Sequence, residues 1–260
     1  MCCCELVMSA VMTPVLTRNV QPIPVLVYHQ IDAAPAKGSP FRSLYVSPAA
    51  FARQMRLLKW LGYTGLSMTG LLPYLSGEKQ GKVAGITFDD GYLNNLKHAL
   101  PVLARHGFSS TCYAVSSLLG KTNVWDVHIG IAQTPLMNDA EIRQWISGGQ
   151  EIGSHTRSHI NLLESGQGIC SAEISQGRTE LEAVLRAPVS HFCYPYGRYE
   201  TRHKAMVDEQ GFVTATTTQR SRCHAGCDML EIPRVPVLRS TSLPMFWIKL
   251  ASGYEDRREK

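Results

Sequence analysis

Short apolar runs alternate along the chain with longer amphipathic segments, and this pattern predicts the order of the secondary structure. Runs rich in β-branched residues predict strands, and apolar residues three and four positions apart predict helices. The predicted strands are 23–29, 83–88, 109–115, 152–154, 189–194 and 212–217. The predicted helices are 47–61, 92–106, 139–148, 172–186 and 200–210. This alternation is typical of parallel strands joined by crossover helices, in a barrel or an open sheet.

Polar residues that could bind a metal or transfer protons lie at or just after the ends of the predicted strands. They are His29, Asp89, Asp90, His155 and Tyr196. Because the carboxyl ends of parallel strands meet at one edge, we expect these side chains to share a single rim. Active sites of α/β barrels are built at that rim. The stretch 120–135 is the least regular and predicts a long loop.

Asp89 and Asp90 follow an apolar strand directly and precede Gly91. Two adjacent carboxylates are costly unless a cation shares their charge. A divalent metal suits this arrangement, with one carboxylate as ligand and its neighbour free to accept a proton from water. Taken alone, the same residues would equally fit a solvated turn, in which Asp and Gly are common.

His155 and His159 lie four residues apart. On a helix or helical turn this spacing places both imidazoles on one face, where they can bind one metal ion. The pair alone is a weak signal. Together with the Asp89–Asp90 turn it gives a His-His-Asp set that leaves coordination positions open for water and substrate.

Three motifs, in order along the chain, resemble those of the polysaccharide deacetylases of carbohydrate esterase family four, which carry the chitooligosaccharide deacetylase homology domain. The motifs span 87–92, 153–159 and 192–197, and the similar order of elements covers about 22–240. The resemblance implies an α/β fold with a distorted (β/α) barrel of about seven parallel strands in a single domain. Residues 1–21 would be an N-terminal extension and 241–260 a C-terminal helix or tail.

The resemblance also implies roles for individual residues. Asp89 would be the general base, and Asp90, His155 and His159 would hold one divalent metal ion. Zn²⁺ is the ion expected first, although Co²⁺, Ni²⁺, Mn²⁺ or Fe²⁺ also suit such sites. A backbone N–H near Tyr196 would assist at the reacting carbonyl.

Two departures from the family pattern concern catalysis. Cys193 stands where many members have an Arg that braces the base, and Arg234 is our candidate replacement, the alternative being an ordinary rim salt bridge. A C-terminal Leu-x-His, the usual general acid, is absent. The segment 25–29 resembles the first strand of the poly-N-acetylglucosamine deacetylase branch, so His29 is expected to be the acid, although a lone His at a strand end is often structural.

Aromatic side chains near these motifs are expected to contact substrate. Tyr194, Tyr196 and Tyr199 would shape the floor beside the metal and stack on a sugar ring. Trp125 and Asp126, in the predicted loop, would line the substrate groove. A Trp that closes the side of the barrel is the alternative for Trp125.

Net charge and cysteine content limit which binding partners and which cellular compartment are expected. The net charge is +5 without a long Lys/Arg run, so nucleic acid is not an expected partner. The eight cysteines do not form a disulfide framework, and reduced thiols are expected, with a metal pair or a disulfide left open for Cys223 and Cys227. No secretory signal or membrane span is recognised, so a cytoplasmic location is expected. Segment 246–250 could contact the inner membrane peripherally, or form a terminal helix packed on the barrel.

These observations together predict a metal-dependent hydrolase. Its substrate would be an N-acetylated amino sugar, an N-acetylhexosamine in a surface polysaccharide, a lipopolysaccharide or a lipid-linked glycan precursor. A deformylase or O-deacetylase would use the same site, and a catalytically silent carbohydrate-binding protein is the alternative of a different class. The sequence makes no prediction of oligomeric state.

Overall fold

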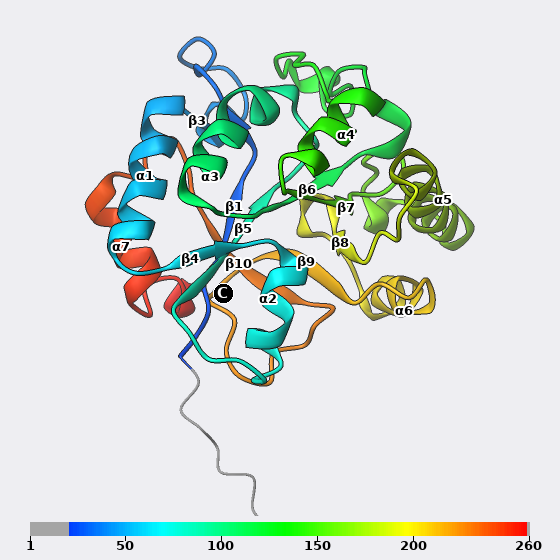
Figure 1. The fold of residues 1–260 in the computed structure, drawn as a ribbon. Helices are drawn as coiled ribbons and strands as arrows, with labels where there is room; N and C mark the ends of the chain where they lie inside the picture. Colours follow the sequence, from blue (N-terminus) through cyan, green and yellow to red (C-terminus); the bar gives the residue numbers. More distant parts are fainter. Residues whose placement is uncertain (1–20, 259–260) are drawn as a thin grey trace, which may run out of the picture.

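A computed structural model describes residues 21–258, and its centre is a ring of parallel strands (Figure 1). Seven strands pair in the order β1-β10-β9-β8-β7-β6-β5, and β1 also pairs with β5, which closes the ring. The strands are β1 (Val25–Tyr28), β5 (Val83–Phe88), β6 (Thr111–Ala114), β7 (Glu151–Ser154), β8 (His191–Cys193), β9 (Thr214–Arg220) and β10 (Ile232–Pro236). The predicted single-domain barrel is therefore confirmed.

Two short elements before β5 have too little pattern to be predicted from sequence. β4 (Thr64–Leu66) pairs with the first half of β5, while β6 pairs with its second half. α2 (Met68–Leu75) follows and contains Pro73, which is unusual within a helix. A further small sheet joins β2 (Gln30–Ile31) to β3 (Tyr45–Val46).

Helices surround the barrel (Figure 1). They are α1 (Pro48–Trp60), α3 (Leu100–His106), α4 (Asp139–Ser147), α5 (Gln167–Leu185), α6 (Thr201–Glu209) and α7 (Leu243–Ala251). Ser47 caps α1 through its side chain, and Asn138 forms a capping box with Glu141. The helix predicted over 92–106 is present as a continuous helical segment, 93–106, in which a π-helical turn, Asn95–Ala99, precedes α3. Pro101 accounts for this turn, because it has no N–H for an intrahelical hydrogen bond.

The core fills the space inside the ring and between the strands and helices. Tyr28 packs edge-on against Phe51 of α1 with ring centroids 5.2 Å apart, and Phe88 packs edge-on against Trp145 of α4 at 5.7 Å. All four side chains are fully buried. These contacts fix the helices against the strands that carry the rim residues.

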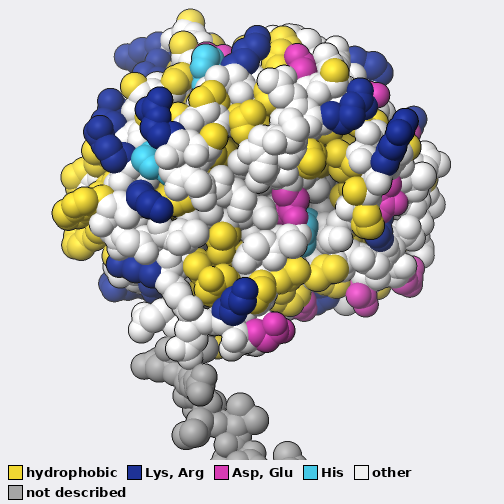
Figure 2. All heavy atoms as spheres, in the orientation of Figure 1, with side chains coloured by type: hydrophobic (Ala, Val, Ile, Leu, Met, Phe, Trp, Pro, Cys, Tyr) yellow, Lys and Arg dark blue, Asp and Glu magenta, His cyan; other side chains and the backbone are white. Residues whose placement is uncertain are grey.

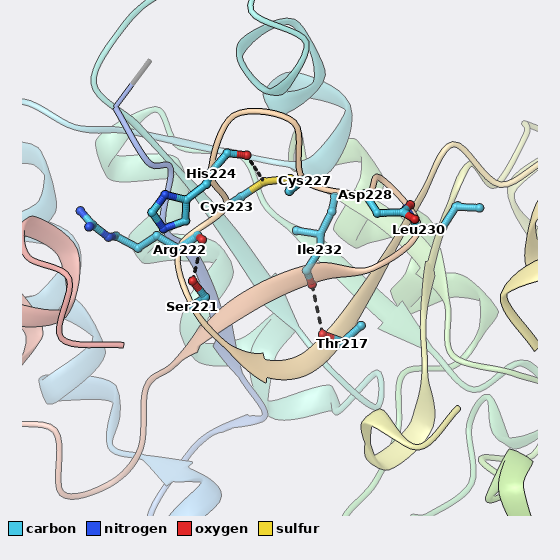
Figure 3. Close-up of a disulfide and its surroundings, with 9 residues drawn as sticks. All are labelled: Thr217, Ser221, Arg222, Cys223, His224, Cys227, Asp228, Leu230 and Ile232. Atoms are coloured by element: carbon cyan, nitrogen blue, oxygen red, sulfur yellow. Dashed lines mark hydrogen bonds between the residues drawn. A yellow bond between two sulfur atoms is a disulfide. The ribbon is translucent and has the colours of Figure 1, made fainter. Parts of the chain in front are cut away.

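Cys223 and Cys227 form a disulfide in the loop between β9 and β10 (Figure 3), so the structure decides for the disulfide over the metal pair. Cys112, Cys170 and Cys193 are free and buried, as expected. Cys2, Cys3, Cys4 and nearly all of the predicted extension 1–21 lie outside the described residues. Within residues 21–258, no helix has the length and apolar character needed to cross a bilayer.

Candidate active site

The ends of β1, β5 and β7 bring the predicted rim residues together. Tyr28 pairs with Phe88 in the sheet, so the next residues, His29 and Asp89, are neighbours. His29 Nε2 lies 3.9 Å from Asp89 Oδ2. The predicted shared rim is therefore confirmed for His29 and Asp89.

Asp90, His155 and His159 form a buried set of potential metal ligands. Their ligand atoms all lie within 4.8 Å of one another. Asp90 Oδ1 lies 3.5 Å from His155 Nε2 and 3.3 Å from His159 Nε2. The Nδ1 of His155 is 2.7 Å from the carbonyl oxygen of Cys193, and an Nδ1–H donated there leaves Nε2 free to bind a metal. One carboxylate and two imidazoles fit a divalent ion such as Zn²⁺.

A second group of potential ligands overlaps the first but fits a metal less well. It consists of Asp89, His155 and Cys193. Arg234 donates hydrogen bonds to both Asp89 oxygens and to the Cys193 sulfur. Because the guanidinium of Arg234 already bonds Asp89 and Cys193, these two side chains are poorly placed to bind a metal ion. We therefore assign the ligand role to the set around Asp90.

The segment between the two histidines is a loop, which corrects the helical turn predicted from their spacing. Thr156 has φ 62° and His159 has φ 61°, both in the left-handed region, and residues 157 and 158 form a bend. The two imidazoles converge because the left-handed residues turn the backbone of this loop. Contacts with α5, the next α-helix along the chain, account for this conformation.

One face of α5 holds the metal loop in place. The Glu173 carboxylate accepts hydrogen bonds from the Ser158 N–H and hydroxyl at 2.7 and 2.6 Å. Four residues on, Gly177 lies so close to the loop that a Cβ there would be 2.9 Å from Arg157 N and from the carbonyl carbon of Thr156. Neither residue was predicted from the sequence. A glycine in a helix interior was the one available signal, because it often marks close backbone approach.

Asp89 is paired with Arg234, which reaches the site from β10. Nη1 donates to Asp89 Oδ1 at 2.6 Å and Nη2 donates to Oδ2 at 2.7 Å. Nη2 also lies 3.2 Å from the sulfur of Cys193. Burial by itself would raise the pKa of Asp89, but the charge and hydrogen bonds of Arg234 outweigh it, and the pKa lies below its ordinary value. Arg234 is 1% exposed, so the alternative of an ordinary rim salt bridge does not apply.

An open groove of about 690 Å³ lies beside the metal set. Trp125 stacks on His159 with ring centroids 4.3 Å apart, and Tyr196 meets the same imidazole edge-on at 4.6 Å. The Tyr196 hydroxyl donates to Asp126 Oδ1 at 3.2 Å. The structure thus gathers three predicted substrate residues, Trp125, Asp126 and Tyr196, at the groove. It adds Phe41, which lines the same groove from a distant segment.

The other two predicted substrate residues lie elsewhere, which is a correction. Tyr194 is fully buried, and its hydroxyl donates to the Leu230 carbonyl at 3.2 Å. Tyr199 stacks on Tyr194 with centroids 4.1 Å apart and lines a separate depression with Arg220. The turn at Tyr196, with φ 58°, redirects the chain, so tyrosines close in sequence face different parts of the molecule.

A family model for polysaccharide deacetylase matches residues 76–215, more than half of the chain. The chain belongs to the polysaccharide deacetylase family. The matched segment of this family member includes Asp89, Asp90, His155 and His159. It excludes His29 and Arg234, so the assignment of these two residues to the site rests on the geometry described above.

Comparisons with individual proteins agree with this assignment. The chain is 24% identical to a Bacillus subtilis protein, YxkH, that carries the polysaccharide deacetylase name, over 85% of this chain and 73% of that protein. It is 21% identical to the poly-β-1,6-N-acetyl-D-glucosamine N-deacetylase of Staphylococcus epidermidis, over 69% of this chain and 64% of that protein. The structure of Streptococcus pyogenes deacetylase PplD in complex with acetate shares the fold, with a TM-score of 0.77, 22% identity, and coverage of 88% and 98%.

Proposed function

We propose that this polysaccharide deacetylase removes the N-acetyl group from an N-acetylhexosamine in a surface polysaccharide, a lipopolysaccharide or a lipid-linked glycan precursor. The observation that carries the proposal is the buried ligand set of Asp90, His155 and His159 directly beside the Asp89–Arg234 pair, at the wall of an open groove. The name of the Staphylococcus epidermidis relative supports an N-acetylglucosamine polymer as a member of this substrate class.

Asp90, His155 and His159 would hold one divalent metal ion, Zn²⁺ being our first choice. Once bound, such an ion polarises an acyl carbonyl and lowers the pKa of a coordinated water. The carbonyl oxygen of Cys193 accepts a hydrogen bond from His155 Nδ1 and so orients the imidazole for this role.

The protein groups supply the proton transfers. Asp89 takes a proton from the attacking water, and Arg234 keeps the carboxylate ionised and oriented toward it. As the C–N bond breaks, His29 gives a proton to the departing amine, and acetate is the second product. His29 is suited to this because 25% of its side chain is exposed beside Asp89, so it can be reprotonated from solvent.

The family resemblance implies a backbone donor for the developing oxyanion near Tyr196, in the turn at 195–197. Pro195 has no N–H, and the N–H of Gly197 already donates to the Tyr194 carbonyl at 2.9 Å. We therefore assign the oxyanion contact to the N–H of Tyr196. Removal of one such donor typically costs about 3 kcal/mol of transition-state stabilisation.

Acetate release tests the proposal. The purified protein is assayed on N-acetylglucosamine oligosaccharides and on a lipid-linked N-acetylhexosamine, before and after metal stripping and after addition of Zn²⁺ or Co²⁺. We expect release that is lost on stripping and restored by metal, and Asp89→Asn should abolish it while the metal stays bound. Formylated and O-acetylated sugars are assayed in parallel. Preference for either would replace the N-deacetylase assignment, and no release from a metal-filled protein would favour a binding role.

We also propose the cytoplasmic location predicted from the sequence. The Cys223–Cys227 disulfide favours an oxidising compartment and therefore provides the test, because disulfides persist in such compartments and are rare in the cytoplasm. Intact cells are treated with a membrane-permeant alkylating agent before lysis, and the modified cysteines are identified by mass spectrometry. Alkylation of both Cys223 and Cys227 supports the cytoplasm, whereas a protected pair would contradict it.

A further inference from the structure

The charges of this chain are segregated along the sequence. Residues 33–77 contain five Lys or Arg side chains and no Asp or Glu, and residues 91–125 contain three and again no Asp or Glu. These two stretches supply α1 and α3, which pack against each other on one side of the barrel. The fold therefore places two acid-free segments next to one another.

The outward side of α1 is both basic and apolar. Phe51, Met55 and Leu58 face the core. Arg53, Arg56 and Trp60, spaced by three and four residues, point the opposite way. Trp60 is 80% exposed, the largest exposed fraction among the large apolar side chains of residues 21–258.

α3 extends this basic surface. Lys59 at the end of α1 lies 5.7 Å from the ring centroid of Phe108, against which His106 also packs at 5.6 Å. Partial burial lowers the pKa of His106, and the nearby cations Arg105, Lys59 and Arg56 lower it further. The cations of the two helices therefore adjoin one another.

Within the described part of the chain, none of Arg53, Arg56, Lys59 and Arg105 forms a salt bridge with an acidic side chain. Figure 2 shows Lys and Arg side chains gathered over α1 and α3, with hydrophobic side chains at the adjoining edge of the molecule. Their positive charge is thus not neutralised within the protein.

We propose that this surface, the α1–α3 face (Arg53, Arg56, Lys59, Trp60 and Arg105), docks the enzyme on a membrane that contains anionic lipids. Unneutralised Lys and Arg side chains are attracted to anionic headgroups. Trp prefers the interface between headgroups and acyl chains, and such an interface gives the exposed Trp60 an apolar environment. A nucleic acid or an acidic polysaccharide also carries negative charge. Neither would give the exposed indole of Trp60 an apolar environment.

The orientation that follows leaves the active site accessible. The strand after α1 pairs Thr64 with Val83, the first residue of β5, whereas Asp89 follows the last residue of β5. Trp60 therefore lies toward the end of the barrel opposite the catalytic rim. An enzyme docked through the α1–α3 face would turn its groove away from the bilayer, toward glycan that extends from the surface.

Vesicle flotation tests the docking surface. The full-length protein is mixed with vesicles of phosphatidylglycerol and phosphatidylcholine, or of phosphatidylcholine alone, at low and high salt. We expect binding only to the anionic vesicles and weaker binding at high salt. Arg53→Glu/Arg56→Glu should weaken it by at least about tenfold, given roughly fivefold per basic residue near an anionic surface. Trp60→Ala should weaken binding to anionic vesicles without changing its salt dependence.

A matched double variant outside the α1–α3 face controls for overall charge. Arg143 and Arg186 are exposed, on α4 and at the end of α5, and Arg143→Glu/Arg186→Glu makes the same change in net charge. It should bind vesicles like the wild type. Equal loss in both double variants, or no binding by the wild type, would overturn the proposal. Retention on DNA or an acidic polysaccharide without vesicle binding would also overturn it.

Two further readouts keep the test independent of folding and of the proposed chemistry. Thermal unfolding checks each variant, and Arg53→Gln/Arg56→Gln replaces the Glu pair if that pair unfolds at lower temperature. Acetate release from a soluble oligosaccharide should be unchanged in all docking variants. Failure of docking and failure of the deacetylase assignment are thereby separate results.

Discussion

The guanidinium of Arg234 and the carboxylate of Asp89 form two parallel hydrogen bonds of 2.6 and 2.7 Å across the barrel. The two residues are 145 positions apart in sequence. Planar pairing of this kind fixes the carboxylate in orientation as well as in charge. In this chain the pair leaves one edge of Asp89 facing His29 and the metal set.

Arg234→Lys should lower acetate release by about 10- to 100-fold while the metal content stays unchanged, because Lys keeps the charge but cannot form the bidentate pair. Initial rates and metal analysis on the same preparation measure the effect. Arg222→Lys, at the Arg222–Asp256 pair, is the control and should keep full activity, because Arg222 lies beside Ile23 and Val83 at the opposite end of the barrel. Loss of metal in Arg234→Lys would mean that Arg234 supports the ligands rather than the base.

His29→Gln should slow hydrolysis of an acetamide by at least about 100-fold, since the amine cannot leave unprotonated. Hydrolysis of 4-nitrophenyl acetate should change far less, because its leaving group needs no proton. The comparison of the two substrates, with the same enzyme preparations, measures the role of the imidazole. Equal losses on amide and ester would exclude His29 as the general acid.

Gly177→Ala should weaken binding of Zn²⁺ at least about tenfold, because a methyl group there meets the backbone of the metal loop at 2.9 Å. Competition with a chromogenic chelator measures the affinity. Gly168→Ala is the matched control, since it lies in the same helix and its Cβ would meet nothing within 4 Å. Equal affinities in the two variants would show that the loop does not depend on close approach to α5.

Glu151, at the start of β7, should make stability depend on pH. Burial tends to raise its pKa, but hydrogen bonds and charge from His191, with further hydrogen bonds from Thr111 and Thr69, lower the pKa from 4.5 to about 2. A carboxyl with a lowered folded-state pKa stabilises the fold above its unfolded pKa, and this contribution disappears as the pH falls toward about 2. Its size is at most about 3 kcal/mol.

Urea unfolding of the wild type and of Glu151→Gln between neutral pH and about pH 2.5 measures this contribution. The difference in unfolding free energy should be largest near neutrality and should shrink through the acid range. Glu78→Gln, on an exposed loop, is the control and should follow the wild type at every pH. A constant difference for Glu151→Gln would contradict the expected linkage.

The sequence alone determined the order of most elements and the placement of the main rim residues. Strand 83–88 and helix 139–147 follow from local apolar periodicity and from an N-cap, which act within a few residues. The positions of Asp89, Asp90 and His155 follow as well, because the ends of parallel strands must share one edge.

Only the tertiary structure decided how these residues are oriented. The spacing of His155 and His159 suggested a helix, but tertiary contacts from Glu173 and Gly177 of α5 hold a loop with left-handed residues. Tyr194 is buried, with its hydroxyl hydrogen-bonded to the Leu230 carbonyl from another segment, whereas Tyr196 lines the groove. Local pattern records which residues tend to form an element, whereas the direction of a side chain depends on partners that folding brings together from far along the chain.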